Sequence, residues 1–298
     1  MEARPLNTPE LRPGTRQTAQ LKGPHARPTI GFLTASIHID VSRRLWRGVV
    51  DAAVRHNINV VCFPGGGLHA PTEFEAQRNV IYDLVNPTGL DGLISWSSTI
   101  AGVLDPVDVI AFHQRYRPLP TVCLTQPVQG IPTLSVDSYQ GMREAIIHLI
   151  EVHGYRHMAF IRGPAEHYYA QERYRAYLDV LAAYDIPFAA ELVTPHLDWQ
   201  EESGADAIRH LLDEAGLRPG VDVQAVVAIS DLLAFGAIEA LQARGIQVPR
   251  DLAVVGFNDT REGRFAMPPL TSVAMPFYEQ GSRAVDTVMA LCRGEEVP

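Results

Sequence analysis

Cysteine is scarce in this chain of 298 residues. The three cysteines, Cys62, Cys123 and Cys292, lie far apart, and no two of them form a CxxC pair. An odd and dispersed set of this kind indicates neither a disulfide framework nor a zinc site. It is typical of reduced structural thiols in a cytoplasmic protein.

Long hydrophobic runs are absent as well. No stretch of about 18 apolar residues occurs, so the sequence predicts no membrane-spanning helix and no membrane partner. Residues 1–28 are rich in Pro, Arg, Thr and Gln, and they lack the apolar segment of a signal peptide. We therefore expect residues 1–27 to form a flexible N-terminal arm and the protein to be cytoplasmic.

An excess of positive charge is also missing. The formal net charge is -9 at pH 7, which disfavours a broad basic face for nucleic acid but leaves room for a small basic element. Hydrophobic residues make up 46% of the chain and charged residues 20%, as in ordinary globular domains. The length suffices for one large domain or two ordinary ones.

Motifs of catalysis and of cofactor binding do not occur. The run Gly65-Gly66-Gly67 lacks the GxGxxG or GK[ST] pattern of a phosphate-binding loop, so we interpret it as a flexible turn. The sequence contains no HExxH or GxSxG motif. His153 and His157 are four residues apart but straddle an expected helix end, which disfavours a metal site. We expect no cofactor, no bound metal and no enzymatic activity.

What the chain does contain is a regular alternation of short apolar runs and amphipathic stretches. The apolar runs predict strands at residues 29–34, 60–63, 92–95, 121–124, 157–161, 192–193, 225–229, 252–257 and 271–275. The amphipathic stretches predict helices at residues 43–56, 71–84, 107–116, 141–152, 171–184, 201–214, 232–244 and 277–293. The strands are continuously apolar, which indicates a parallel sheet that is covered by helices on both faces.

The alternation restarts after the fourth strand. It therefore predicts an α/β fold of two similar, doubly wound parallel-sheet lobes with a cleft between them. We expect the first lobe to comprise residues 28–137 and 259–293, the second lobe residues 138–258, and a tail residues 294–298. Because ligands bind at the carboxyl ends of parallel strands, the cleft is the expected binding site.

Polar and aromatic side chains follow several of the predicted strands. The candidate ligand-binding residues are Ser36, His38, Trp96, Thr125, Arg173, Trp199, Asp231, Asn258 and Asp259. Aromatic rings combined with an arginine and carboxylates suit a polyhydroxylated ligand, because sugar C–H faces pack on indole rings and hydroxyls bond to charged planar groups. Three alternatives stay open: a lone tryptophan is more often a core residue, Asp231 can be a helix N-cap, and Arg173 can be a solvated charge.

Several segments occur in an order and spacing that resemble a known family. They are residues 90–94, 136–141, 148–150, 154–164, 171–175, 202–204, 229–236, 248–259 and 268–273. On these segments the chain resembles the effector-binding core of the lactose-repressor-type (LacI/GalR) transcriptional regulators, from residue 28 to residue 293. The resemblance implies the periplasmic-binding-protein type I fold, a small-molecule effector and a homodimer.

The resemblance also implies roles for single residues. Arg173 matches the family's effector-binding arginine, and Asp231 matches its aspartate before the next helix. Trp199 matches an aromatic that covers the effector. Thr125 matches a polar position after the fourth strand, and Trp96 matches a pocket residue after the third strand. Asn258-Asp259 matches a pair at a lobe crossover.

Departures from the family pattern limit what the resemblance implies. Ile39-Asp40-Val41-Ser42 replaces the usual Asn-Pro-Phe-Phe, which removes an aromatic wall and leaves the identity of the ligand open. Ser230 replaces an asparagine, and Ala176 stands where glycine is usual. The first 28 residues contain no helix-turn-helix, so DNA binding requires a headpiece outside this chain. The sequence also ends before the family's last strand, from which we expect a longer protein with a C-terminal output domain, or a trimmed repressor.

These observations together predict a sensor of a sugar or sugar-like molecule. Ligand binding would close the two lobes and shift an existing equilibrium, in a LacI-type regulator or in a multidomain signalling protein. Two alternatives remain, namely a solute-binding protein of a transport system and an enzyme on the same scaffold. Whether the ligand activates or represses is not fixed by the sequence.

Overall fold

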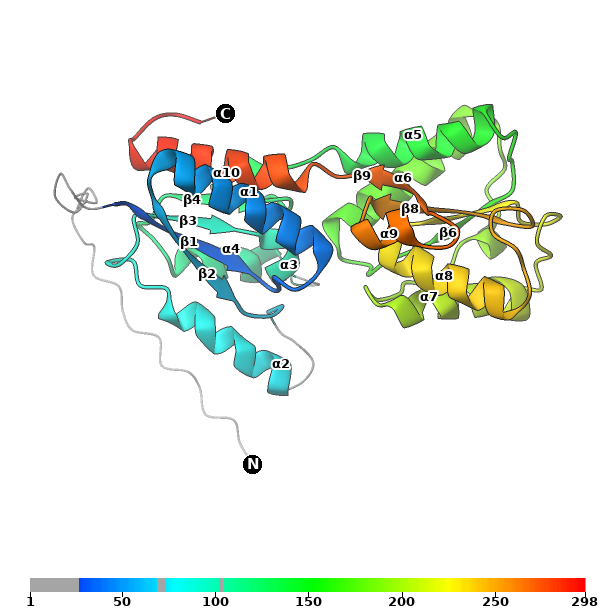
Figure 1. Ribbon diagram of the computed structural model, residues 1–298, viewed down its shortest axis with the longest axis horizontal. Helices are drawn as coiled ribbons and strands as arrows, with labels where there is room; N and C mark the ends of the chain where they lie inside the picture. Colours follow the sequence, from blue (N-terminus) through cyan, green and yellow to red (C-terminus); the bar gives the residue numbers. More distant parts are fainter. Residues whose placement is uncertain (1–26, 69–72, 102–103, 105, 298) are drawn as a thin grey trace.

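The computed structural model describes residues 27–68, 73–101, 104 and 106–297, and it forms two lobes that lie end to end (Figure 1). The first lobe contains a five-stranded sheet in the order β2-β1-β3-β4-β5. Its strands are β1 (Thr29–Thr34), β2 (Asn59–Pro64), β3 (Gly92–Ser95), β4 (Thr121–Leu124) and β5 (Thr133–Leu134). Every pair of neighbouring strands in this sheet is parallel.

The second lobe contains a four-stranded parallel sheet in the order β6-β7-β8-β9. Its strands are β6 (Met158–Ile161), β7 (Ala225–Ala228), β8 (Ala253–Asn258) and β9 (Thr271–Ala274). The strand predicted at residues 192–193 is reduced to a single parallel bridge between Val193 and Phe160. The two parallel sheets confirm the predicted α/β fold class.

Helices cover both sheets, as the continuously apolar strands require. The helices of the first lobe are α1 (Asp40–His56), α2 (Glu73–Arg78), the 3-10 helix η1 (Asn79–Leu84), α3 (Ser97–Ala101), α4 (Pro106–Gln114) and α10 (Phe277–Cys292). Those of the second lobe are α5 (Ser138–Glu151), α6 (Tyr168–Ala183), η2 (Ala190–Leu192), α7 (Glu201–Ile208), the π-helix η3 (Arg209–Glu214), α8 (Asp231–Ala243) and α9 (Arg261–Phe265).

Glycines allow one closely packed helix pair in each lobe. In the first lobe a Cβ on Gly48 of α1 would lie 2.0 Å from the Tyr278 carbonyl oxygen of α10, and a Cβ on Gly281 would lie 2.2 Å from that of Leu45. In the second lobe a Cβ on Gly204 of α7 would lie 2.1 Å from the Leu233 carbonyl oxygen of α8. The contacts of Gly48 and Gly281 pack α10, near the end of the described chain, against α1. Figure 1 shows α1 and α10 side by side.

Burial differs between the two sheets. All residues of β6 and β7 are buried, although β6 is an edge strand, where Phe160 forms a parallel bridge to Val193. In β2, at the edge of the first sheet, Phe63 is buried and the other residues are exposed or partly buried. The large core cluster includes residues of both lobes, among them Phe32 and Trp96 in the first and Phe160 and Phe257 in the second.

The structure corrects the expected boundary between the lobes. Residues 259–275 were assigned to the first lobe, but β9 pairs with β8 from Val255–Thr271 to Asn258–Ala274 and therefore belongs to the second. The chain returns to the first lobe only between β9 and α10. Apolar periodicity identifies a strand but not its partner, which is why the sequence misplaced this segment. Residues 1–26 of the expected arm lie outside the described residues.

Candidate functional site

Arg173 lies on α6 in the interior of the second lobe and is only 3% exposed. Its Nη1 donates a hydrogen bond to the Ile229 carbonyl oxygen at the end of β7, 2.5 Å away. The guanidinium carbon lies 3.6 Å from the centroid of the Phe257 ring and 5.5 Å from that of Tyr169. Burial lowers the pKa of Arg173 to about 9. Arg173 is therefore not a solvated charge, and its Nε is buried without a hydrogen-bond partner among the described residues.

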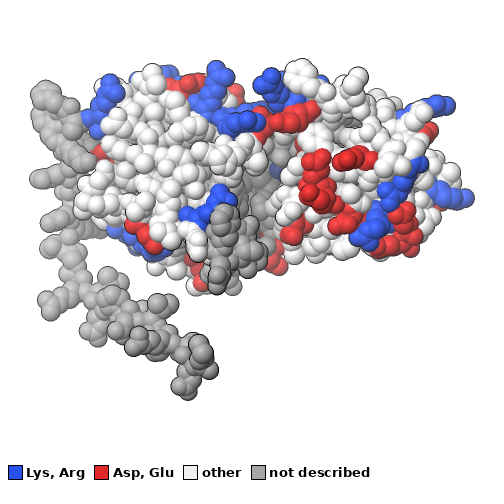
Figure 2. All heavy atoms as spheres, turned by 60° about the horizontal axis from the view of Figure 1, so that its bottom comes forward, with Lys and Arg blue, Asp and Glu red and all other residues white. Residues whose placement is uncertain are grey.

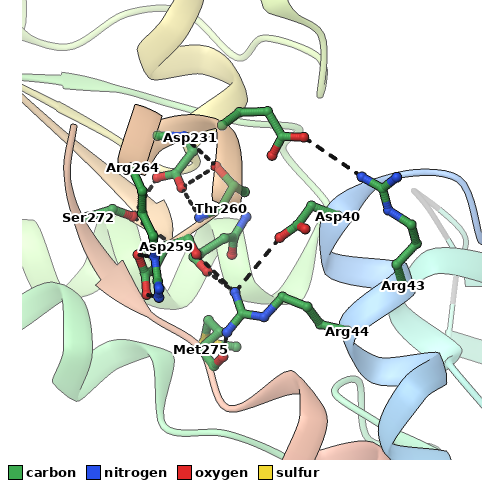
Figure 3. Close-up of polar contacts among 12 residues, drawn as sticks. Asp40, Arg43, Arg44, Asp231, Asp259, Thr260, Arg264, Ser272 and Met275 are labelled. Atoms are coloured by element: carbon green, nitrogen blue, oxygen red, sulfur yellow. Dashed lines mark hydrogen bonds and ion pairs between the residues drawn. The ribbon is translucent and has the colours of Figure 1, made fainter. Parts of the chain in front are cut away.

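Asp231 begins α8 and is fully buried. One carboxylate oxygen accepts hydrogen bonds from the backbone N–H and the hydroxyl of Thr260, at 2.7 and 2.9 Å, and the other accepts one from the Ser272 hydroxyl at 2.5 Å (Figure 3). Burial raises the pKa of Asp231. The N-cap of α8 is Ser230, whose hydroxyl accepts from the Leu233 N–H. Asp231 thus joins α8 to Thr260, which follows β8, and to Ser272 in β9.

Trp199 precedes α7 and packs against His167, with ring centroids 4.8 Å apart in an edge-to-face arrangement. His167 is the N-cap of α6, where its Nδ1 accepts a hydrogen bond from the Ala170 N–H. Burial lowers the pKa of His167 to about 4, and the nearby charge of Arg173 adds to this effect. His167 thereby connects Trp199 to the surroundings of Arg173, a role that the sequence interpretation missed.

Tyr169 is a second residue that the sequence interpretation missed, and it connects the lobes. Its hydroxyl accepts a hydrogen bond of 2.9 Å from the Val136 N–H in the segment that links β5 to α5. Burial raises the pKa of this hydroxyl, and the side chain of Thr125, which follows β4 in the first lobe, opposes that shift. Thr125 is buried and has a φ of 77°, an uncommon conformation for a non-glycine residue. We call Arg173, Tyr169, His167, Trp199 and Asp231 the cleft cluster.

The other candidates from the first lobe lie differently. Trp96 is 4% exposed and packs on Phe277 of α10 with ring centroids 6.2 Å apart, so it is a core residue in this arrangement. Ser36 and His38 belong to the loop after β1, where the Ser36 hydroxyl accepts a hydrogen bond from the His38 N–H. Among the described contacts, neither Ser36 nor His38 contacts a residue of the cleft cluster.

Asn258 and Asp259 lie at the carboxyl end of β8, with φ values of 116° and 50°. Because β9 stays in the second lobe, this pair is not at a crossover, and that expectation is wrong. Arg44 of α1 reaches across from the first lobe, and its Nη1 donates to the Asn258 and Asp259 carbonyl oxygens at 3.1 and 3.0 Å. The Asp259 carboxylate pairs with Arg264 (Figure 3).

Two cavities of ligand size lie outside the cleft cluster. One, of about 340 Å³, is in the first lobe and is lined among others by His113, Arg117 and Leu291. The other, of about 380 Å³, lies where the lobes meet and is lined by Asp40, Arg44, Asp259, Arg261, Arg264 and Phe265. Basic and acidic side chains stand next to one another along this boundary in Figure 2.

The described residues contain no group of three or more His, Cys, Asp and Glu side chains that could hold a metal ion. Across the same residues, no helix is both long and apolar enough to span a membrane.

Comparison with known proteins defines the family. The sequence profile of the periplasmic binding protein-like domain matches residues 147–298. The chain belongs to this family. The regulator CelR of Thermobifida fusca is 36% identical over 169 residues, which cover 57% of this chain and 48% of CelR. The chain thus spans about half the length of this relative.

Solved structures extend the likeness to both lobes. A CelR–cellobiose complex superposes with a TM-score of 0.75 and 28% identity, covering 91% of this chain and 80% of that one. A LacI family transcriptional regulator from Mycobacterium smegmatis superposes with a TM-score of 0.77 and 27% identity, covering 90% and 91%. The homologues and structural neighbours of this family member are LacI-type transcriptional regulators, which confirms the predicted resemblance.

Proposed function

We propose that this chain is the ligand-sensing part of a cytoplasmic LacI-type transcriptional regulator and that it binds a sugar or sugar-like molecule at the cleft cluster. One observation carries the proposal: Arg173 is buried, yet its Nε has no partner among the described residues. A buried unpaired donor is costly unless a ligand or water accepts from it. The cellobiose in the CelR complex supports a carbohydrate as the ligand class.

The arrangement suggests how binding would be transmitted. Tyr169 lies against Arg173, and its hydroxyl accepts a hydrogen bond from the Val136 N–H in the segment that links β5 of the first lobe to α5 of the second. A ligand that accepts from Arg173 would change the packing of this tyrosine and hence the relative stability of the open and closed lobes. The size of the response is set by the difference in ligand affinity between the two states.

We propose no catalytic role. The arrangement in the described residues that most resembles a nucleophile and base is Ser95 with His113, whose Nε2 lies 2.8 Å from the Ser95 hydroxyl oxygen. Ser95 is fully buried, and the His113 Nδ1 bonds to the Val109 carbonyl oxygen rather than to a carboxylate. Burial also lowers the pKa of His113. Although His113 lines the cavity of about 340 Å³ in the first lobe, the pair has a fully buried serine and no carboxylate to orient the histidine, which supports a binding function rather than an enzyme.

We propose a homodimer as the assembly and DNA contact through a headpiece outside these residues. Leu232 and Met267 are 39% and 90% exposed, although both are apolar. Their segments are joined by a hydrogen bond from the Gln242 side chain to the Met267 carbonyl oxygen. An apolar surface of this kind suits a second copy of the chain. In light scattering, Met267→Glu should favour the monomer, whereas Phe188→Glu, at another exposed apolar position, should not.

The binding proposal is tested by titrating cellobiose, ribose and cytidine in calorimetry. We expect one of them to bind, and Arg173→Met to weaken it at least about tenfold by removing a charged donor. Arg175→Met is the matched control, because Arg175 is exposed on the same helix and pairs with Glu172. Trp199→Leu provides a second variant if Arg173→Met does not fold. An affinity that both cleft variants leave unchanged contradicts the site.

A further inference from the structure

The cavity of about 380 Å³ at the lobe boundary is separate from the cleft cluster. Asp40 and Arg44 line it from α1 of the first lobe, and Asp259, Arg261, Arg264 and Phe265 line it from the second. We call it the boundary pocket. Arg173, Tyr169 and Trp199 do not line it. Its volume falls within the range of small-molecule sites.

Arg44, one of the residues that line the boundary pocket, extends from α1 toward the end of β8 (Figure 3). Besides the two carbonyl oxygens at the end of β8, it donates to the Met275 carbonyl oxygen, at 3.2 Å, where the chain crosses back to the first lobe. These acceptors are neutral and do not cancel the charge of the guanidinium. The carboxylate of Asp40 is 4.0 Å away, at the limit of an ion pair.

The remaining charges leave the boundary pocket with one unmatched positive charge. Arg264 pairs with Asp259, which also raises the pKa of Arg264. Arg261 has no ion pair among the described residues, and its guanidinium carbon lies 5.9 Å from the centroid of the Phe265 ring. The six lining residues include three arginines and two aspartates, so their formal charge is +1. Arginine guanidinium groups bind phosphate and carboxylate groups in pairs of hydrogen bonds.

Two further features restrict the ligand. One oxygen of Asp40 is buried and accepts no hydrogen bond among the described residues, so it can accept from a ligand hydroxyl. Phe265 is 75% exposed and offers an apolar ring beside Arg261. We propose that the boundary pocket binds a small hydroxylated anion, an organic phosphate or carboxylate, with its charge on Arg261 and Arg44 and a hydroxyl on Asp40.

Such an anion would contact both lobes at once. Arg44 and Asp40 belong to α1, whereas Arg261 belongs to α9. A ligand that binds both walls stabilises the lobe arrangement in which they face each other. The boundary pocket would therefore regulate lobe closure from a site separate from the cleft cluster, and this proposal does not depend on the ligand of that cluster.

The proposal is tested by calorimetry and thermal unfolding of the 298-residue chain with glucose 6-phosphate, gluconate and glucose, with sodium chloride added to equal ionic strength. We expect at least one of the two anions to bind and to raise the unfolding temperature, and glucose to have no effect in this pocket. Arg261→Ala should weaken binding of the anion about tenfold, because it removes the unpaired guanidinium. Arg47→Ala is the matched control, since Arg47 is exposed on α1 and lies 3.8 Å from Asp51.

Arg173→Met distinguishes this site from the cleft cluster. It should leave binding of the anion unchanged even if it abolishes binding of a sugar in the cleft. The proposal is overturned if neither anion acts beyond the sodium chloride control, or if Arg173→Met removes anion binding while Arg261→Ala does not.

Discussion

The cleft cluster and the boundary pocket both combine arginine with aspartate, but they expose these charges to water very differently. In the cleft cluster Arg173 and Asp231 are buried, and burial shifts both pKa values toward the neutral form. In the boundary pocket Arg264 is 62% exposed and pairs with Asp259, which stabilises the charged form of the arginine. The same residue types therefore have opposite electrostatic behaviour in the two regions.

The difference shows what each region can do. A buried charge that is held by hydroxyls and backbone groups fixes the surrounding segments, and any change in it alters the fold's stability. An exposed pair contributes little to stability, because water and salt screen it, but it remains accessible to a soluble anion. We therefore expect substitutions in the cleft cluster to affect unfolding and those in the boundary pocket to affect mainly binding.

The largest expected contrast is between the two aspartates. Asp231→Ala removes the common acceptor of the Thr260 N–H and of the Thr260 and Ser272 hydroxyls, so we expect the free energy of unfolding to fall by about 2–4 kcal/mol. Asp259→Asn should lower it by less than about 1 kcal/mol, because its partner Arg264 stays hydrated and asparagine tolerates the left-handed backbone that Asp259 adopts. Urea unfolding followed by circular dichroism measures both. Equal losses in the two variants would contradict the comparison.

A smaller effect is expected from the pH dependence of His167. Its pKa is about 4 in the folded protein, below its value of about 6.5 in an unfolded chain. Between these values the unfolded chain binds a proton that the folded protein does not, so stability falls as the pH falls from 6.5 through 4. The loss attributable to His167 should approach about 2–3 kcal/mol at pH 4.

His167→Asn isolates this contribution. Asparagine preserves an N-cap acceptor for α6 but does not titrate. Urea unfolding of both proteins between pH 7 and pH 4 should show a steeper loss for the natural sequence. Parallel curves for the two proteins would mean that His167 is not held neutral by the fold.

The sequence predicts the elements better than their contacts. Continuous apolar strands such as β7 and the amphipathic α1 and α10 were predicted close to their bounds, because burial leaves a direct periodic pattern. The short β5, α3 and α9 were missed, since elements of two to five residues carry too few positions for a period. The sheet to which β9 belongs depends on long-range pairing, which leaves no local pattern.

The candidate site was predictable only in part. Arg173 and Asp231 are both buried in the second lobe, as expected for two residues of one site. That they bind a ligand stays a prediction. Their partners were not predictable, because Thr260 and Ser272 are 29 and 41 positions from Asp231. His167 left one usable signal, its position directly before a helix, whereas the hydrogen bond of Tyr169 to Val136 depends on how the lobes are placed.

The smallest expected effect lies in an exposed ion pair across the lobe boundary. Arg43 of α1 and Glu262 of α9 approach to 3.8 Å, with side chains 60% and 57% exposed. A double-mutant cycle with Arg43→Ala and Glu262→Ala should give a coupling of about 0.2–0.5 kcal/mol at low ionic strength, typical of hydrated pairs. About 1 M sodium chloride should abolish it, because the screening length is then about 3 Å. If the coupling persists in high salt, this exposed pair behaves like the buried charges of the cleft cluster. Solvent exposure would then not explain the electrostatic difference between the two regions.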